Sequence, residues 1–504
     1  GWAWGMFIIV AAILVYKSLG EIANFFSEFK KWFKGLQVLD RILVGTGLLS
    51  VAFMLGVAGY AWFLPLHLVQ ESDFMIYHVM LPRQHLIRGT FEFIPWSPFD
   101  LFLLPIDYAI APFGLATVFP NKIPQLMFFV GLVLIAIELV NRKPLPLVLV
   151  LFLILGSHGI GIQMGTAMLD LAIAYLLLAA WDSLRKGKIA LFLVEFCFYF
   201  WAKPFVPLQT ILIAVGLCVV YGLFKLFKSK RIEILPGEEL KFSFRHNKQL
   251  LVKGVIGFFA LSAVIAGPFI FKSLYYAGTP LFPFAPGTMM VNKDIDKTSE
   301  SWHSIEETSQ VVTERGKAYG HGRGVNAFIK HFWLVSVPED GVNNRYDYPA
   351  GLPFLLVLLP FFYLFVKGIC ERTFNLAQWF TVFYWGLWWM TSQQMRFLYI
   401  AILLMFIAVV FDTKILSRSL LFCILLAMTL NALSVFRAHK MDFGKPHEGM
   451  LRPKDRELVR LSGEYVQSGQ VGSVVLDYDY GDVAFAQFPV TIKKEYPPYL
   501  LATD

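Results

Sequence analysis

The stretch SDFMIYHVMLPRQHLIRG, residues 72–89, places several ionisable side chains directly after a segment that is apolar enough to cross a membrane. Asp73 and Tyr77 are four residues apart, so they would share one face of a helix lying along the membrane surface. A carboxylate in this place could accept a proton from a hydroxyl or amine while a membrane-embedded donor approaches from the side. We therefore interpret Asp73 as a candidate general base.

The same stretch has a simpler interpretation. Arg83 and Arg88 could anchor a solvated loop to lipid headgroups, with Trp96 in the aromatic belt of the interface. The stretch would then carry no chemistry. In either case we expect Arg83 and Arg88 to contact headgroups or a substrate.

A second carboxylate, Asp170, lies near the outer end of the apolar segment GTAMLDLAIAYLLLAAW. A charged side chain at the centre of a bilayer costs about 2.5–3.5 kcal/mol on insertion scales, so such residues tend to face a polar cavity and to have a function. The alternative is a structural hydrogen bond between helices. We interpret Asp170 as a candidate substrate-binding residue.

Three single cations occur at the outer ends of apolar segments, namely Lys203, Lys272 and Arg396. Each of them could simply extend its charged end toward water at the interface. If the three converge, however, they would form a site for a lipid phosphate, which Arg binds through two parallel hydrogen bonds and Lys binds as a point charge.

The elements that position these residues must cross a lipid bilayer. Hydrophobic residues make up 57% of the 504 positions and charged residues 16%, against about 25% charged in an average soluble domain. Lipid leaves backbone groups no partner outside a helix or a closed barrel. We predict an all-α polytopic membrane protein with about twelve transmembrane helices, over residues 2–18, 41–63, 122–141, 144–158, 162–182, 189–203, 205–226, 250–271, 350–367, 376–392, 397–412 and 418–435.

The basic residues indicate how these helices are oriented. Lysines and arginines fall in every second loop, which marks one face as cytoplasmic. The other face carries the outer loops 64–121 and 272–349 and a small tail, 436–504, after a transmembrane domain over residues 1–435. The candidate site residues are therefore expected on the extracytoplasmic face. Because the net charge of +8 is spread over short loops, nucleic acid is not a predicted partner.

Residues 21–40, EIANFFSEFKKWFKGLQVLD, alternate aromatic and basic side chains at helical spacing. This pattern is typical of a helix that lies among lipid headgroups, so membrane lipids are predicted contacts.

No pattern for a metal, a disulfide or a nucleotide is present in the sequence. The four cysteines lack paired spacing, and the histidines of loop 272–349 lack the spacing of zinc ligands. A Walker-type glycine loop is also missing. We predict no metal site, and we disfavour a primary pump or an enzyme that takes nucleotide-activated substrates.

Several short motifs follow one another in a characteristic order. Asp73, Tyr77 and His78 are followed by Pro82 and Gly89. Next come DLAIA at 170–174, Lys203 after the following apolar segment, PFIFKSLYYAGTPLFPF at 268–284 and RFLYI at 396–400. This ordered set, within residues 40–412, resembles the GT-C superfamily of glycosyltransferases, in the branch of bacterial aminoarabinose and protein mannosyl transferases.

The chain departs from the family pattern at three positions. The family's second acidic residue beside the first is represented only by Glu71, Phe269 replaces a usual tryptophan, and Ile400 replaces a usual proline. These departures concern the acceptor geometry and metal dependence more than the fold.

The resemblance implies an inverting glycosyltransferase in the bacterial inner membrane that uses a polyprenyl-phosphate-linked sugar as donor. The acceptor would be a lipid or a glycan, with a protein as the alternative. Asp73 would be the general base, with Tyr77 and His78 supporting it. Lys203, Lys272 and Arg396 would stabilise the leaving phosphate, and Asp170 would orient the substrate or a divalent cation, the one cofactor with which the resemblance is compatible.

Two other functions compete with this interpretation. A lipid or saccharide transporter also uses intramembrane carboxylates and interfacial cations, but it would spread them through the spans toward both faces. A catalytically silent GT-C-like subunit of a larger membrane complex would have the same fold.

Overall fold

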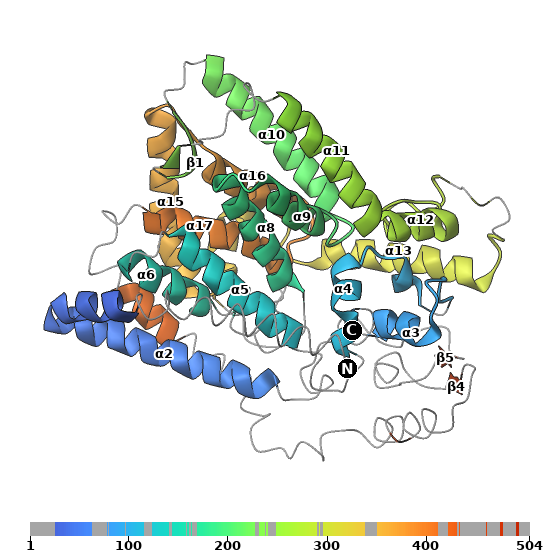
Figure 1. Ribbon diagram of the computed structural model, residues 1–504, viewed down its shortest axis with the longest axis horizontal. Coiled ribbons are helices and arrows are strands. Elements are labelled where there is room, and N and C mark those ends of the chain that lie inside the picture. Colours follow the sequence, from blue (N-terminus) through green and yellow to red (C-terminus); the bar gives the residue numbers. More distant parts are fainter. Residues whose placement is uncertain are drawn as a thin grey trace.

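The computed structural model describes most of the chain between residues 26 and 430. The described segments are 26–62, 78–114, 123–140, 144–160, 169–226, 231–239, 248–289, 296–337, 350–411 and 422–430, with gaps at 79, 96, 158 and 237, and short pieces at 163, 292, 433, 460, 474–476 and 490–492. These segments are mostly helical, which confirms the predicted helical class (Figure 1).

Helices occur where the apolar segments predict them. They are α2 (Val38–Trp62), α5 (Ile123–Leu139), α6 (Pro144–Leu155), α8 (Asp170–Arg185), α9 (Ile189–Phe200), α10 (Val206–Leu226), α11 (Lys248–Ile265), α15 (Leu352–Cys370), α16 (Leu376–Met390) and α17 (Tyr399–Phe411). The predicted span 2–18 lies outside the described residues, and of the predicted span 418–435 the structure describes helical residues 422–430 and residue 433.

Fewer of these helices can cross a membrane by themselves than the sequence predicts. Within the described residues, three are long and apolar enough: Val38–Gly56 of α2, α10 and α15. A fourth span results if α11 and α12 (Gly267–Ala277), which meet at a bend of 59°, are counted together. These helices are compatible with a membrane protein, but the predicted number of about twelve spans is not confirmed.

Helix length explains the difference. Within the described residues, helices α6, α9 and α17 contain 12, 12 and 13 residues. This corresponds to about 18–20 Å at 1.5 Å per residue, against about 30 Å of hydrocarbon. Helix α17 packs against α6, α8, α15 and α16, and all of its side chains from Tyr399 to Val410 are buried. A helix that is apolar on every side is typical of the centre of a bundle.

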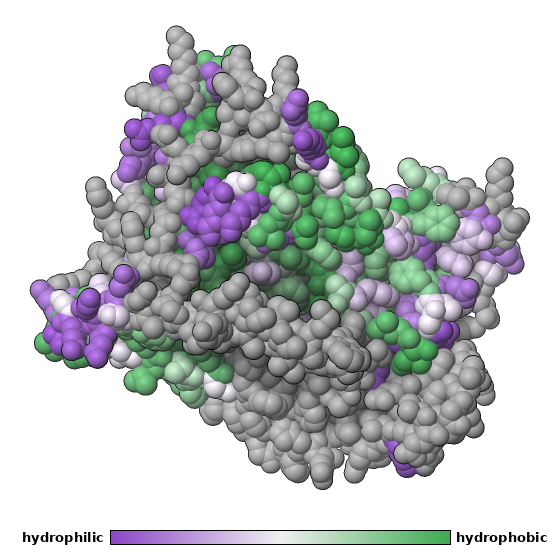
Figure 2. Space-filling model, viewed as in Figure 1, coloured by the Kyte–Doolittle hydropathy of each residue, from purple (hydrophilic) through white to green (hydrophobic). Residues whose placement is uncertain are grey.

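Helix α8 has helices packed against it on several sides. Helix α8 packs between α5 and α9, α9 packs against α11, and α10 packs against α16 (Figure 1). Figure 2 shows apolar side chains over α9 and α11, and hydrophilic side chains at the far left, where the helix of residues 26–35 lies.

Further helices lie in the predicted outer loops and turns, and three of the candidate residues, Arg83, Arg88 and Arg396, lie in them. These helices are α3 (Met80–Arg88), η3 (Pro98–Leu101), α4 (Pro105–Gly114), α13 (Glu300–Ala318), α14 (Val325–Leu334) and η6 (Met395–Leu398). Prolines begin η3 and α4, and Pro268 lies at the bend between α11 and α12, because proline lacks the amide hydrogen that a helix interior needs. The described residues of the predicted outer loop 272–349 thus contain the end of α12 and the helices α13 and α14.

Strands are few in the described part of the chain. Strand β1 (Arg231–Leu235) lies between β2 (Glu238–Glu239), which is antiparallel to it, and β3 (Thr373–Asn375), which is parallel, with Arg231 opposite Thr373. In the C-terminal tail, β4 (Val474–Leu476) pairs in parallel with β5 (Val490–Ile492).

Candidate functional site

Asp170 and Lys203 form a buried ion pair. Asp170 is the first residue of α8, where the helix dipole favours a negative charge. Lys203 lies in the turn between α9 and α10, and its Nζ is 2.5 Å from Oδ1 of Asp170. The two side chains are 2% and 12% exposed, and Gln163 Nε2 donates to the other carboxylate oxygen over 3.4 Å.

Arg396 adds a second cation to this pair. It lies in η6, between α16 and α17, and it interacts electrostatically with Asp170. The Arg396 guanidinium and the Lys203 ammonium both approach the ring of Phe397, at 5.3 and 4.9 Å from its centre. We call Asp170, Lys203 and Arg396 the Asp170 group. It holds two positive charges and one negative charge.

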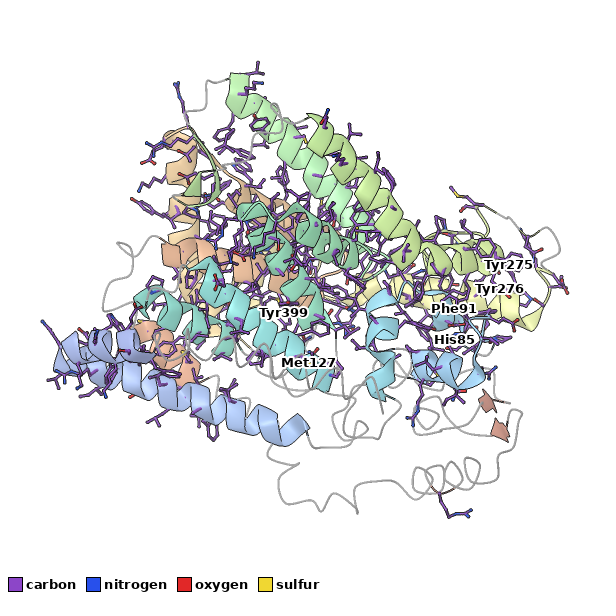
Figure 3. All side chains as sticks on the ribbon, viewed as in Figure 1. His85, Phe91, Met127, Tyr275, Tyr276 and Tyr399 are labelled. Carbon is purple, nitrogen blue, oxygen red and sulfur yellow. The ribbon has the colours of Figure 1, made fainter. Side chains whose placement is uncertain are left out.

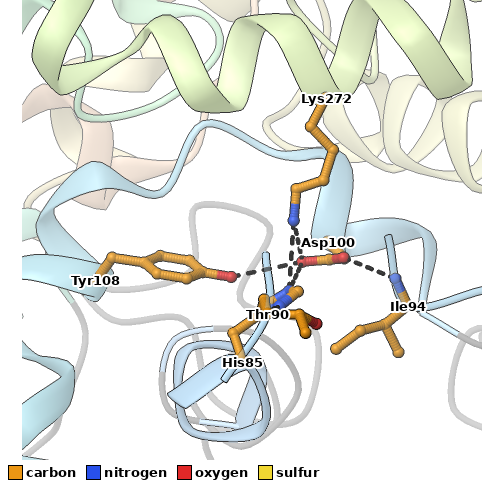
Figure 4. A network of polar contacts seen from close by, with 6 residues as sticks. All are labelled: His85, Thr90, Ile94, Asp100, Tyr108 and Lys272. Carbon is orange, nitrogen blue, oxygen red and sulfur yellow. Dashed lines mark hydrogen bonds and ion pairs between the residues drawn. The ribbon is translucent and has the colours of Figure 1, made fainter. Parts of the chain in front are cut away.

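Lys272 belongs to a separate network, which we call the Asp100 group: His85, Asp100 and Lys272 (Figure 4). Lys272 Nζ is 3.0 Å from Asp100 Oδ1, His85 Nε2 is 2.7 Å from the same oxygen, and all three residues are at most 4% exposed. The ring of Phe91 lies 3.8 Å from the ammonium and packs against His85 (Figure 3). The predicted three-cation site therefore contains Lys203 and Arg396, whereas Lys272 is neutralised by Asp100.

A tight turn after α3 builds the Asp100 group. Gly89 ends α3 with φ of 68°, a left-handed conformation that glycine adopts without strain. The turn brings the Thr90 carbonyl to His85 Nδ1, which donates to it over 2.8 Å. Further along, the amide of Ile94 donates to Asp100 Oδ2 over 2.8 Å.

His78 and Asp107 form a third buried contact. His78 Nδ1 lies 2.5 Å from Asp107 Oδ1, and the residues are 4% and 1% exposed. Burial raises the pKa of the Asp107 carboxyl, and the neighbouring His78 and Lys203 oppose this effect. His78 also interacts electrostatically with Asp170.

Helix α4 carries residues that contact both His78 and the Asp100 group. It carries Asp107 and, one residue later, Tyr108, whose hydroxyl lies 3.5 Å from Asp100 Oδ1. The pKa of Tyr108 is raised well above its usual value by burial first and then by Asp100 and Asp107. The tyrosine therefore keeps its proton.

The remaining predicted residues differ in their surroundings. Asp73 and Tyr77 lie outside the described residues. Arg83 is 2% exposed, and burial lowers its pKa to about 10. Burial also lowers the pKa of Arg88, against the opposing effect of Asp100. A buried Arg83 does not fit the interpretation of this stretch as a solvated loop.

Sequence reasoning missed Asp100 and Asp107. Both lie in the segment PFDLFLLPIDYAIAPFG, residues 98–114, where they are the two charged residues of an otherwise largely apolar run. A carboxylate in such a run is rarely buried unless it is paired, and this signal would have marked both residues.

No group of three or more His, Cys, Asp or Glu residues is placed to hold a metal ion within the segments described above. The divalent cation compatible with the resemblance stays a prediction. Compared with known protein families, curated proteins and solved structures, the chain matches none of them.

Proposed function

We propose that this protein is a GT-C-like glycosyltransferase of the bacterial inner membrane. It transfers a sugar from a polyprenyl-phosphate-linked donor to a lipid, glycan or protein acceptor on the extracytoplasmic face, with inversion at the anomeric carbon. Residues 1–435 would form its membrane domain of about twelve spans.

One observation carries the proposal. Lys203 and Arg396 come from parts of the chain almost two hundred residues apart. Lys203 pairs with Asp170, Arg396 interacts electrostatically with the same carboxylate, and both cations approach the ring of Phe397. The Asp170 group has one excess positive charge and lies in a largely buried place, where an anion is attracted more strongly than in water. A phosphate ester is an anion of the right kind, because Arg and Lys are its usual partners in proteins.

The proposed reaction uses this charge when the sugar leaves. Asp73 takes the proton of the acceptor, and the acceptor oxygen or nitrogen attacks the anomeric carbon. Negative charge then develops on the departing phosphate, and Lys203 and Arg396 stabilise it. Lys272 has no part in this step, because Asp100 already balances its charge.

The distribution of charge along α8 favours an enzyme over a transporter. Asp170 begins the helix, and Asp182 and Arg185 lie in its last turn, bonded to each other. The 15 residue steps from Asp170 to Arg185 correspond to about 22 Å. Within α8 the charges thus gather at the two ends, whereas a transport path would require polar groups between them.

The direct test is the variant Asp73→Asn in an assay that follows release of polyprenyl phosphate from polyprenyl-phosphate-linked sugars. Removing the base is expected to lower turnover by a factor of about 10² to 10⁴. Glu306→Gln is the matched control, since Glu306 is an exposed carboxylate on α13. Unchanged turnover in a folded Asp73→Asn protein would exclude the proposed base.

A further inference from the structure

Helix α14, in the predicted outer loop 272–349, exposes an apolar face. Four of its side chains form this face: Val325, Phe328, Ile329 and Trp333, which are 77%, 43%, 64% and 57% exposed. At 3.6 residues per turn they cover one arc of about 140° around the helix, and none of them is polar at its contact surface apart from the indole nitrogen. A contiguous apolar surface of this kind marks a place where the protein meets a partner or a membrane.

His331 fixes the rotation of α14 about its own axis. The imidazole is fully buried, its Nδ1 donates to the carbonyl of Phe328, and its Nε2 accepts from Nε1 of Trp385 on α16 over 3.0 Å. Both ring nitrogens therefore have a partner, as a buried imidazole requires. Because His331 is directed toward α16, Val325 and Ile329 on another side of the helix are directed away from it.

A third side of α14 is polar. Asn326 and Lys330 are exposed and lie one helical turn apart, and they line a groove together with His321 and Leu334. None of the four side chains of the apolar face lines this groove. A short helix with an apolar face and a separate polar face is typical of a helix that lies in the interface of a membrane.

Contacts at its two ends hold α14 across the outer ends of α15 and α16. Before its first residue, the Arg323 guanidinium donates over 2.5 Å to the carbonyl of Thr391, the residue that follows α16. After its last residue, the carbonyl of Val335 accepts over 2.8 Å from the amide of Ala350, two residues before α15. Helix α15 is long and apolar enough to span a membrane, so α14 lies at the level where this span would leave the hydrocarbon.

The apolar face of α14 is continuous with an exposed apolar side of α15. Phe332 lies within the arc of this face, and its ring is 6.4 Å from the ring of Phe362 on α15. Beside Phe362, Leu359 and Tyr363 are both more than half exposed. Lipid chains cover such side chains on a membrane span. A soluble protein could not cover the two helices together without entering the hydrocarbon, whereas lipid can.

We propose that α14 docks on the outer leaflet of the membrane, with its apolar face among the lipid chains below the headgroups and with Asn326 and Lys330 in water. The partner is the lipid bilayer itself. Trp333 suits this place, because tryptophan is enriched where a membrane meets water. The inference rests on the predicted membrane spans, and it is independent of the proposed sugar transfer.

The experiment compares two neighbouring positions of the same helix by electron paramagnetic resonance. The full chain carries alanine at its three exposed cysteines, Cys218, Cys370 and Cys423, and a nitroxide label at Ile329→Cys or Lys330→Cys. It is reconstituted in nanodiscs of phosphatidylcholine and phosphatidylglycerol. Oxygen concentrates in the hydrocarbon, and a nickel chelate stays in water. We expect the ratio of oxygen to nickel collisions to be about tenfold higher at position 329 than at position 330.

Two further comparisons make the result decisive. Leu359→Cys gives the ratio for the exposed side of α15, and a label there that collides freely with the nickel chelate would show that both the span and this inference are wrong. Val325→Cys and Asn326→Cys repeat the comparison if a variant of the first pair does not fold.

Two results would overturn the docking of α14 even if Leu359→Cys reports lipid. If the label at position 329 collides with the nickel chelate as often as the label at position 330, the apolar face lies in water. If the label at position 329 is shielded from both reagents, a protein, such as a second copy of this chain, covers the face instead of lipid.

Discussion

Lys203 and Lys272 have the same appearance in the sequence but different surroundings in the fold. Each is a single lysine at the end of an apolar segment, and each pairs with a carboxylate. Lys203 shares its carboxylate with Arg396, so the Asp170 group has an excess positive charge. Lys272 meets Asp100 in a fully buried place, within a network that also includes His85. The first arrangement can hold an anion, and the second serves the stability of the fold.

The Asp100 group gives a prediction at the scale of single residues. In Asp100→Asn the ammonium of Lys272 loses its counter-charge while it stays buried, which is expected to lower the free energy of unfolding by about 3–5 kcal/mol. Replacing Lys272 by Met in the same protein should recover most of this loss. Denaturant titration in mixed micelles measures both variants. If the single and the double variant are equally unstable, the buried charge of Lys272 is not the cause of the lost stability.

Sequence reasoning found both members of the Asp170–Lys203 pair, but only Lys272 of the Lys272–Asp100 pair and only His78 of the His78–Asp107 pair. Lys203, Asp170 and Lys272 are conspicuous because they are charges in apolar segments, and His78 because it follows Asp73 and Tyr77. Their pairing depends on distances between residues 29 to 172 positions apart, which no local pattern contains. The partner Asp100 lies in the stretch 64–121, which the sequence alone indicates as an outer loop. In the structure Asp100 is part of helix η3, which begins with Pro98.

The short apolar helices are the elements that the sequence describes least well. Hydropathy identifies their positions, because α6, α9 and α17 coincide with predicted spans. It cannot distinguish a span from a helix buried in the bundle, since both are apolar on every side. Bends and helix ends also depend on the neighbours, as at the 59° bend between α11 and α12.

The close packing of α2 on α6 depends on Gly47, and this dependence can be tested at the scale of the two helices. A Cβ added at Gly47 would overlap the ring of Phe152 on α6 and the side chain of Leu425, whereas one added at Gly45 would meet nothing within 4 Å. Gly47→Leu is therefore expected to lower the free energy of unfolding by about 1–3 kcal/mol. Gly45→Leu is the control, and denaturant titration compares them. Equal losses in the two variants would show that α2 does not pack closely on α6.

At the scale of the whole molecule, composition alone predicts the helical class. With 57% hydrophobic and 16% charged residues, the chain must bury most of its surface in lipid or in a large apolar core. The candidate site lies where segments far apart in the chain meet: α4, the start of α8, the turn after α9, and η6. Which residues meet there depends on how the helices pack. The motifs therefore predicted which residues belong to the site better than they predicted the contacts among these residues.

The central claim is that Lys203 and Arg396 stabilise a departing lipid phosphate. Its most direct test is the turnover of Lys203→Ala and Arg396→Ala in release of polyprenyl phosphate from polyprenyl-phosphate-linked sugars. Each variant is expected to be slower by a factor of about 10² or more, whereas Lys188→Ala, an exposed lysine beyond the opposite end of α8, should be unaffected. Turnover of Lys203→Ala and Arg396→Ala equal to that of the unmodified protein would contradict the claim.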